Sequence, residues 1–158
     1  MNKHGVRSDL EKNKAITDRP VPTDVKGLWK FLGLAAYLHK YSRNYAEMTV
    51  YLSRLLKQTE KWVWSTECQH SFEGIKQSLI RSPVLAIADQ YRPSHVVCDT
   101  SDFSIGCALM QYDADDAERV VCYQSNQLKP AKRNYPVDDK ELLSMKYTLD
   151  KFIVYLLG

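Results

Sequence analysis

Long apolar runs are missing from this sequence. Residues 1–19 are polar and charged, and no later segment approaches the roughly 20 apolar residues that a membrane-spanning helix needs. We therefore expect no secretory signal, no membrane partner and a location inside the cell, in the cytoplasm or the nucleus. Repeats and low-complexity stretches are also absent, and the 158 residues, 44% hydrophobic and 26% charged, are typical of a globular chain.

Closely spaced cysteine pairs are missing as well. The four cysteines, Cys68, Cys98, Cys107 and Cys122, show none of the Cys-x-x-Cys spacing that zinc sites and redox motifs use. Because isolated cysteines behave as small buried hydrophobes, we interpret them as reduced and structural. The formal net charge of +3 is too small to identify a nucleic-acid-binding protein by itself.

Between residues 23 and 82 the apolar residues recur at helical spacing and predict three helices. The first helix follows Pro22 and takes Thr23 as its N-cap. Its predicted buried stripe is Val25, Leu28, Trp29, Leu32 and Ala36. The second helix is expected over residues 45–57, and its inward residues are Met48, Tyr51, Leu52 and Leu55. The third begins at Ser65 and ends before Pro83, and its apolar side is Cys68, Phe72, Ile75 and Leu79.

Trp62, Val63 and Trp64 lie between the last two of these helices. Two interpretations are open for this aromatic group. The side chains could fill the space between helices, or they could form a surface on which nucleic-acid bases stack.

After Ser94 the spacing changes from helical to alternating and predicts three strands. Their cores are Val96 to Cys98, Ile105 to Leu109, and Val120 to Tyr123. The link at residues 112–119 is short enough for an antiparallel meander. Its acidic residues predict a solvated turn, since a calcium loop needs a different spacing. A closing helix is expected from Pro136 to about Leu157, and its apolar side is Leu142, Met145, Leu149, Phe152, Ile153 and Leu156.

Two carboxylates stand where they could converge. Asp99 ends an apolar strand and shares a face with Val97, whereas Glu141 lies near the start of the closing helix. Facing carboxylates of this kind can hold the Mg²⁺ ions that cleave phosphodiesters. The alternatives are that Asp99 caps the turn at residues 100–102 and that Glu141 favours the positive end of its helix.

A series of short motifs in both halves carries a family resemblance. In the first half they are Phe31-Leu32-Gly33-Leu34 with Tyr37, Leu55-Leu56-Lys57, Trp64-Ser65 with Glu67-Cys68, and Pro83-Val84-Leu85. In the second half they are Asp99-Thr100-Ser101 with Ile105-Gly106, Tyr123 with Ser125 and Leu128, Asn134-Tyr135, Lys140-Glu141-Leu142-Leu143, and Tyr155-Leu156 with Gly158. In this order they resemble the junction between reverse transcriptase and ribonuclease H in Gypsy-class LTR retrotransposon polyproteins.

The resemblance implies an α+β chain in two parts. Residues 1–90 would be a helical thumb and connection segment, and residues 91–158 a truncated ribonuclease H-like unit of three antiparallel strands and one long helix. It implies that Asp99 and Glu141 are catalytic, metal-binding carboxylates. The intact parent would use Mg²⁺ or Mn²⁺ and act on an RNA–DNA hybrid or a template-primer.

The resemblance also implies an incomplete enzyme. The family's later ribonuclease H acids would follow Gly158, and its polymerase Asp-Asp motif would precede Met1. Asp115-Asp116 lacks the flanking strand that this motif requires. We therefore expect the chain alone to bind no metal tightly and to cleave little or nothing.

Two departures from the family pattern concern nucleic-acid contact. Residues 38–42 replace the usual aromatic and basic thumb segment, and Asn126 stands where a basic residue is usual. A basic set could still contact nucleic acid, or it could be a solvated helix face. This set is Lys26, Lys30, His39, Lys40 and Arg43.

The alternative function is a non-catalytic, domesticated module that binds nucleic acid or protein. A three-stranded sheet without further strands would expose an unpaired edge, which favours self-association.

Overall fold

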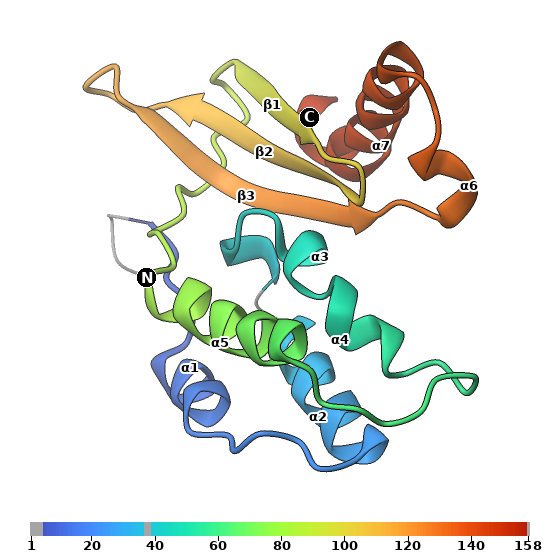
Figure 1. The fold of residues 1–158 in the computed structure, drawn as a ribbon. Helices are drawn as coiled ribbons and strands as arrows, with labels where there is room; N and C mark the ends of the chain where they lie inside the picture. Colours follow the sequence, from blue (N-terminus) through green and yellow to red (C-terminus); the bar gives the residue numbers. More distant parts are fainter. Residues whose placement is uncertain (1–4, 37–38, 158) are drawn as a thin grey trace.

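The computed structural model describes residues 5–36 and 39–157 (Figure 1). Tyr37, Leu38 and Gly158, which belong to the motifs and segments named above, lie outside the described residues. Helices make up the first half of the chain, and an antiparallel sheet followed by a long helix makes up the second. The α+β class expected from the sequence is therefore confirmed.

The helical half contains more elements than the sequence predicted. They are α1 (Leu10–Thr17), α2 (Val25–Ala36), the 3₁₀ turn η1 (His39–Tyr41), α3 (Tyr45–Met48), α4 (Val50–Arg54) and α5 (Thr66–Ile80). Helix α1 was not predicted, because its only buried residue is Ile16. Its N-cap is Asp9, whose side chain accepts a hydrogen bond from the backbone N–H of Glu11.

The predicted cap of α2 was wrong, and its predicted buried stripe was right at Leu28 and in part at Leu32 but wrong at Val25, Trp29 and Ala36. The helix is capped by Asp24 rather than Thr23, since the Asp24 carboxylate accepts a hydrogen bond of 2.6 Å from the backbone N–H of Gly27. The buried residues are Leu28, Phe31 and Ala35, whereas Trp29 is 60% exposed. Phe31 occupies the core because its ring packs on Phe72 of α5, with ring centroids 4.6 Å apart.

The single helix predicted over residues 45–57 is divided at Thr49. The Thr49 hydroxyl donates to the carbonyl oxygen of Ala46, as a side chain that competes with the helix backbone does. Leu52 and Leu55 are buried as predicted, but Tyr51 is exposed.

Helix α5 agrees with the sequence prediction at its start and along its buried side. The Ser65 hydroxyl accepts a hydrogen bond from the backbone N–H of Cys68, which makes Ser65 the N-cap. All four residues predicted on its apolar side are buried, namely Cys68, Phe72, Ile75 and Leu79.

The three strands are β1 (Ser94–Thr100), β2 (Ser104–Tyr112) and β3 (Glu118–Gln127), in the order β1-β2-β3. Both pairs are antiparallel, which confirms the meander. The register between β2 and β3 shifts at Leu109, where Val121 is the extra residue of a bulge. The short helix α6 (Pro130–Arg133) then leads into α7 (Val137–Leu156).

The sheet lies between α7 and the helical half (Figure 1). On the α7 side, Ile105, Leu109 and Phe152 form the centre of a second apolar core. On the other side, the backbone at Gly106 comes so close to Asn44 that a Cβ atom at this position would stand 2.5 Å from the Asn44 Oδ1 atom. Glycine permits this close approach.

The predicted apolar side of α7 was wrong, apart from Phe152. The buried residues of α7 are Ser144, Thr148 and Phe152, and the partly buried Leu143 and Tyr147 pack against the same core. The remaining predicted residues are exposed, between 37% and 67%, and comprise Leu142, Met145, Leu149, Ile153 and Leu156. The small side chains of Ser144 and Thr148 let the helix approach the strands closely at these two positions.

Candidate active site

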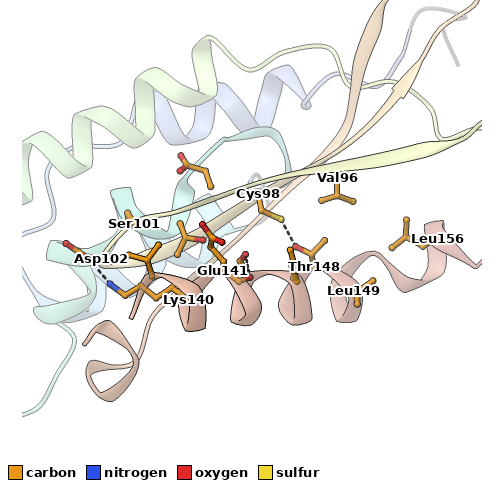
Figure 2. Close-up of a pocket in the computed structure, with 14 residues that line it drawn as sticks. Val96, Cys98, Ser101, Asp102, Lys140, Glu141, Thr148, Leu149 and Leu156 are labelled. Atoms are coloured by element: carbon orange, nitrogen blue, oxygen red, sulfur yellow. Dashed lines mark hydrogen bonds and ion pairs between the residues drawn. The ribbon is translucent and has the colours of Figure 1, made fainter. Parts of the chain in front are cut away.

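A groove of about 800 Å³ runs between β1 and α7 (Figure 2). One end is polar and contains Ser101, Asp102, Lys140 and Glu141. The other end is apolar, with Val96, Leu149 and Leu156. The groove therefore combines charged groups with an apolar wall, as many ligand sites do.

Asp99 is exposed near the end of β1 and pairs in register with Gly106 of β2. It lines the groove and also a smaller hollow that Arg43, Val97 and Tyr123 line. Asp99 and Val97 both line this hollow, as expected if the two side chains share one face of the strand. Asp99 is therefore accessible to solvent, and its strand is an edge strand of the sheet within the described residues.

Glu141 is exposed in the second turn of α7 and lines the same groove. The first turn already carries Asp138 and Asp139, which are nearer to the positive end of the helix. The structure thus brings the two predicted carboxylates to one groove, from two different elements. Within the described part of the chain, no hydrogen bond or ion pair joins them to each other.

The turn after β1 is capped by Ser101 and not by Asp99. The Ser101 hydroxyl oxygen accepts hydrogen bonds from the backbone N–H groups of Phe103 and Ser104, at 3.2 and 3.1 Å. This leaves the Asp99 carboxylate without the turn-capping role that was one of the two interpretations of this residue.

An ion pair in the groove was missed by the sequence reasoning. The Lys140 ammonium donates to the Asp102 carboxylate at 2.7 Å, and the Lys140 side chain is 12% exposed (Figure 2). This hydrogen bond and the charge of Lys140 hold the pKa of Asp102 below its usual range. The two residues are 38 positions apart in the sequence, so no short motif could predict that they form an ion pair. Asp102 is therefore engaged by a cation beside Glu141.

The chemical type of the carboxylate oxygens in the groove suits a hard divalent cation. Asp99 and Glu141 offer carboxylate oxygens, which Mg²⁺ and Mn²⁺ prefer, and Mg²⁺ often takes one or two carboxylates together with water and substrate phosphates. Across residues 5–36 and 39–157 no group of three or more His, Cys, Asp or Glu side chains could hold a metal ion. In the described residues, Asp99 and Glu141 are thus a pair of carboxylates and not part of a complete metal-binding cluster.

The predicted basic set lies on the helical half and is not part of the lining of the groove. Lys26 and Lys30 are exposed on α2, and Arg43 is exposed beside Tyr123 of β3. Lys40 is half-buried, with its ammonium 5.1 Å from the centre of the Tyr41 ring. The ring nitrogen Nδ1 of His39 donates a hydrogen bond to the carbonyl oxygen of Ala36.

The aromatic segment between α4 and α5 fills space between helices. Trp62 and Trp64 are half-buried against the first core, and the Trp64 ring meets Phe72 edge-on at 5.8 Å. The Trp64 indole N–H donates to the Gln69 side chain at 2.8 Å. Val63 is exposed. The two tryptophans therefore follow the first of the two interpretations.

The acidic link between β2 and β3 is a hydrogen-bonded turn. The Asp113 carboxylate accepts hydrogen bonds from the backbone N–H groups of Asp115 and Ala117 and from the Arg119 guanidinium. The bond to Arg119 is the largest cause of the lowered pKa of Asp113. The carboxylate is used to close the turn, as the solvated-turn prediction requires.

Comparison with known proteins identifies the family. The model of the RNase H-like domain found in reverse transcriptase matches residues 64–158. The chain therefore belongs to this family, which confirms the resemblance to the reverse transcriptase and ribonuclease H region of retrotransposon polyproteins.

Curated relatives are retrotransposon polyproteins. The chain is 31% identical over 165 aligned residues to the retrovirus-related Pol polyprotein from transposon opus of Drosophila melanogaster, covering 98% of this chain and 16% of that protein. It is 35% identical over 135 residues to the transposon Tf2-3 polyprotein of Schizosaccharomyces pombe, covering 85% of this chain and 10% of that protein. The chain thus spans a small part of each relative.

Solved structures share the fold. The foamy viral protease-reverse transcriptase dRH in complex with double-stranded DNA superposes with a TM-score of 0.85 at 22% identity, over 98% of this chain and 27% of that one. The foamy viral protease-reverse transcriptase in complex with an RNA/DNA hybrid gives a TM-score of 0.84 at 22% identity, over 99% of this chain and 21% of that one.

Within the part of the chain that the structure describes, no helix is long and apolar enough to cross a membrane.

Proposed function

We propose that this chain is the junction of a Gypsy-class LTR retrotransposon polyprotein at which the reverse transcriptase, residues 1–90, meets the ribonuclease H-like unit, residues 91–158. Its parent would synthesise DNA from RNA and hydrolyse the RNA strand of RNA–DNA hybrids inside the cell. Asp99 and Glu141 would be two of the metal-binding catalytic carboxylates. The observation that carries this assignment is that both carboxylates, one from β1 and one from α7, line one groove.

The groove supports this role through its charge and shape. Mg²⁺ or Mn²⁺ bound there would supply activation of a water molecule and stabilisation of the leaving oxygen. The chain's own part would be to hold the ion with the Asp99 and Glu141 oxygens, while Lys140 pairs with Asp102 at the polar end. With two carboxylates the ion keeps most of its water, so we expect weak binding and little or no cleavage by this chain alone.

The proposed partner is an RNA–DNA hybrid or a template-primer duplex. The two foamy viral structures with the same fold hold double-stranded DNA and an RNA/DNA hybrid, respectively. Lys26, Lys30, Lys40 and Arg43 are the proposed phosphate contacts of the helical half. Such contacts would make binding fall steeply with salt.

Incubation of a labelled RNA–DNA hybrid with Mg²⁺ or Mn²⁺ tests this proposal. The chain, Asp99→Asn and Glu141→Gln should all cleave no more than the buffer does, and the chain should bind the hybrid in a salt-dependent way. Asp115→Asn, at an exposed acid of the β2–β3 turn, is the matched control. Metal-dependent cleavage that both site variants abolish and the control keeps would overturn the partial-site proposal.

The second candidate is a non-catalytic module that binds protein, here a second copy of the chain. In the described residues no strand pairs with the outer edge of β1, and the exposed α7 side chains lie along the groove beside it. We expect the chain to associate as its concentration rises in analytical ultracentrifugation, and Leu149→Lys to weaken this association. A monomer at every concentration would contradict self-association.

A further inference from the structure

Cys98 and Cys107 lie directly opposite each other on neighbouring strands. They pair in the antiparallel register of β1 and β2, which places both side chains on the face that α7 covers. Each Sγ atom is 2.9 Å from the Oγ1 atom of Thr148. The two sulfur atoms therefore meet at one hydroxyl group and can be no farther apart than twice that distance (Figure 2 shows the bond from Cys98).

This geometry suits a disulfide. Directly opposed residues of an antiparallel pair have Cα atoms about 4.5–5.5 Å apart, and disulfides span Cα distances of about 4.4–6.8 Å. Because these two ranges of Cα distance overlap, a disulfide here would call for a change of side-chain rotamer and not for a shift of either strand. The spacing of the cysteines does not predict this pair, because they are nine residues apart with a turn between them.

The two thiols differ in their access to solvent. Cys98 is exposed in the groove between β1 and α7, whereas Cys107 is buried beneath it. An oxidant that enters the groove would reach Cys98 first, and Cys107 stands where it can complete the bond. The other two cysteines, Cys68 and Cys122, are buried, and neither has a cysteine as its partner in the strand register.

We propose that Cys98 and Cys107 are a reversible dithiol site that a two-electron oxidant, such as hydrogen peroxide, converts into a cross-strand disulfide. Peroxide oxidises the Cys98 thiol to a sulfenic acid and releases one water. The Cys107 sulfur then attacks the Cys98 sulfur, the S–S bond forms, and the hydroxyl group leaves with the Cys107 proton as a second water. The two thiols lose two electrons in total, and a thiol reductant restores them.

The disulfide would change the contact between the sheet and α7. In the reduced protein the two thiols and the Thr148 hydroxyl share their hydrogens, and Thr148 is buried in this contact. Oxidation removes both S–H hydrogens, so neither cysteine can then donate a hydrogen bond to the Thr148 hydroxyl. Cys98 directly precedes Asp99, so the dithiol site adjoins the proposed metal ligand. The proposal for the dithiol is argued from the strand register and the contacts with Thr148, and it does not depend on a catalytic role of Asp99.

Peptide mapping of the purified chain before and after peroxide treatment tests the proposal. Trypsin leaves both cysteines in one peptide, because no lysine or arginine lies between them, and chymotrypsin can cut that peptide at Phe103. After peroxide, the two pieces should stay joined until a reductant is added. Mass spectrometry should show the loss of two hydrogen atoms relative to the untreated chain.

Variants separate this pair from the other cysteines. Cys98→Ser, at the exposed position, should abolish the joined peptide, whereas Cys68→Ser and Cys122→Ser should keep it. Circular dichroism of each variant, compared with that of the unchanged chain, tests whether the variant is folded. Separate pieces after peroxide in the unchanged chain, or a bond that joins Cys107 to Cys122 or one chain to another, would overturn the proposal.

Discussion

The side-chain amide nitrogen of Gln127, on β3, lies 3.0 Å from the hydroxyl oxygen of Thr49, at the break between α3 and α4. The same nitrogen lies 3.0 Å from the Ala46 carbonyl oxygen and 3.3 Å from the Ser53 hydroxyl. Nearby, the backbone N–H of Ala46 donates to the Ser125 hydroxyl at 2.9 Å. These bonds fix the sheet on the helical half, and so they set the position of β1 and its groove.

Replacement of Gln127 should therefore loosen this contact. We expect Gln127→Ala to lower the free energy of unfolding by about 1–3 kcal/mol, since the change leaves part-buried acceptors without their donor. Asn126→Ala, at the exposed neighbouring position, should change it by less than about 0.5 kcal/mol. Urea denaturation measures both values. Equal effects of the two variants would show that the Gln127 contacts do not stabilise the fold.

The close approach of β2 to Asn44 makes a second prediction. A methyl group at Gly106 would stand 2.5 Å from the Asn44 Oδ1 atom, so Gly106→Ala should cost about 1–3 kcal/mol of unfolding free energy. Asn44 has a φ of 58°, a left-handed conformation that glycine adopts without strain. Adding Asn44→Gly should thus restore part of the loss.

Gly33→Ala is the matched control for this pair, because among the described residues the added methyl group in α2 meets no atom within 4 Å beyond its own helix backbone and chain neighbours. In a helix interior it should stabilise the chain by about 0.5–1 kcal/mol. Thermal denaturation of the four variants gives the comparison. Full additivity of Gly106→Ala and Asn44→Gly would contradict a steric conflict between these two residues.

Burial of Tyr147 predicts a loss of stability at alkaline pH. Burial raises its pKa to about 12 from the ordinary value of 10.0, and its hydroxyl donates to the Ser125 carbonyl at 3.1 Å. The folded chain keeps this proton longer than the unfolded chain does. The contribution is therefore fully present below pH 10 and disappears as the pH rises through about 12.

Urea denaturation between roughly pH 9 and pH 12 measures whether the free energy of unfolding falls as the pH rises. The range runs from roughly one pH unit below the ordinary pKa of tyrosine to the raised pKa of Tyr147. Tyr147→Phe should start from a lower stability, because it lacks the hydrogen bond, and should lose less as the pH rises. Tyr91→Phe, at an exposed position, should follow the unchanged chain. An identical decline for Tyr147→Phe would contradict the prediction.

The ion pair in the groove gives a prediction for Asp102. Because the Lys140 hydrogen bond is the largest cause of the lowered pKa of the Asp102 carboxyl, Lys140→Met should raise that pKa toward its usual range. A titration followed by NMR at the Asp102 side chain measures the change. Lys146→Met, an exposed lysine on the same helix, should leave it unchanged.

Local chemistry explains which parts of the fold the sequence could predict. The Ser65 cap and the buried side of α5 depend on neighbours within the helix, and both were predicted. The buried face of α2 could not be, because Trp29 and Phe31 are equally apolar and only the position of Phe72 decides between them. In the same way, the burial of Thr148 on α7 depends on the two cysteines across from it.

The same distinction holds for the candidate site. Asp99 could be singled out because a carboxylate in an apolar strand is costly without a role, and Glu141 through its position on the facing helix. The pairing of Asp102 with Lys140 and the meeting of Cys98 with Cys107 arise from the β1–β2 turn and from the register, which no short motif encodes.

The most direct test of the proposed site is a titration with Mn²⁺, whose unpaired electrons broaden the NMR signals of nearby nuclei. We expect the backbone signals around Asp99 and Glu141 to broaden first. Asp99→Asn and Glu141→Gln should each reduce this broadening, whereas Asp115→Asn should not. Broadening that begins at the Asp113–Asp116 turn, or that is unchanged in both site variants, would contradict the assignment of these two carboxylates as metal ligands.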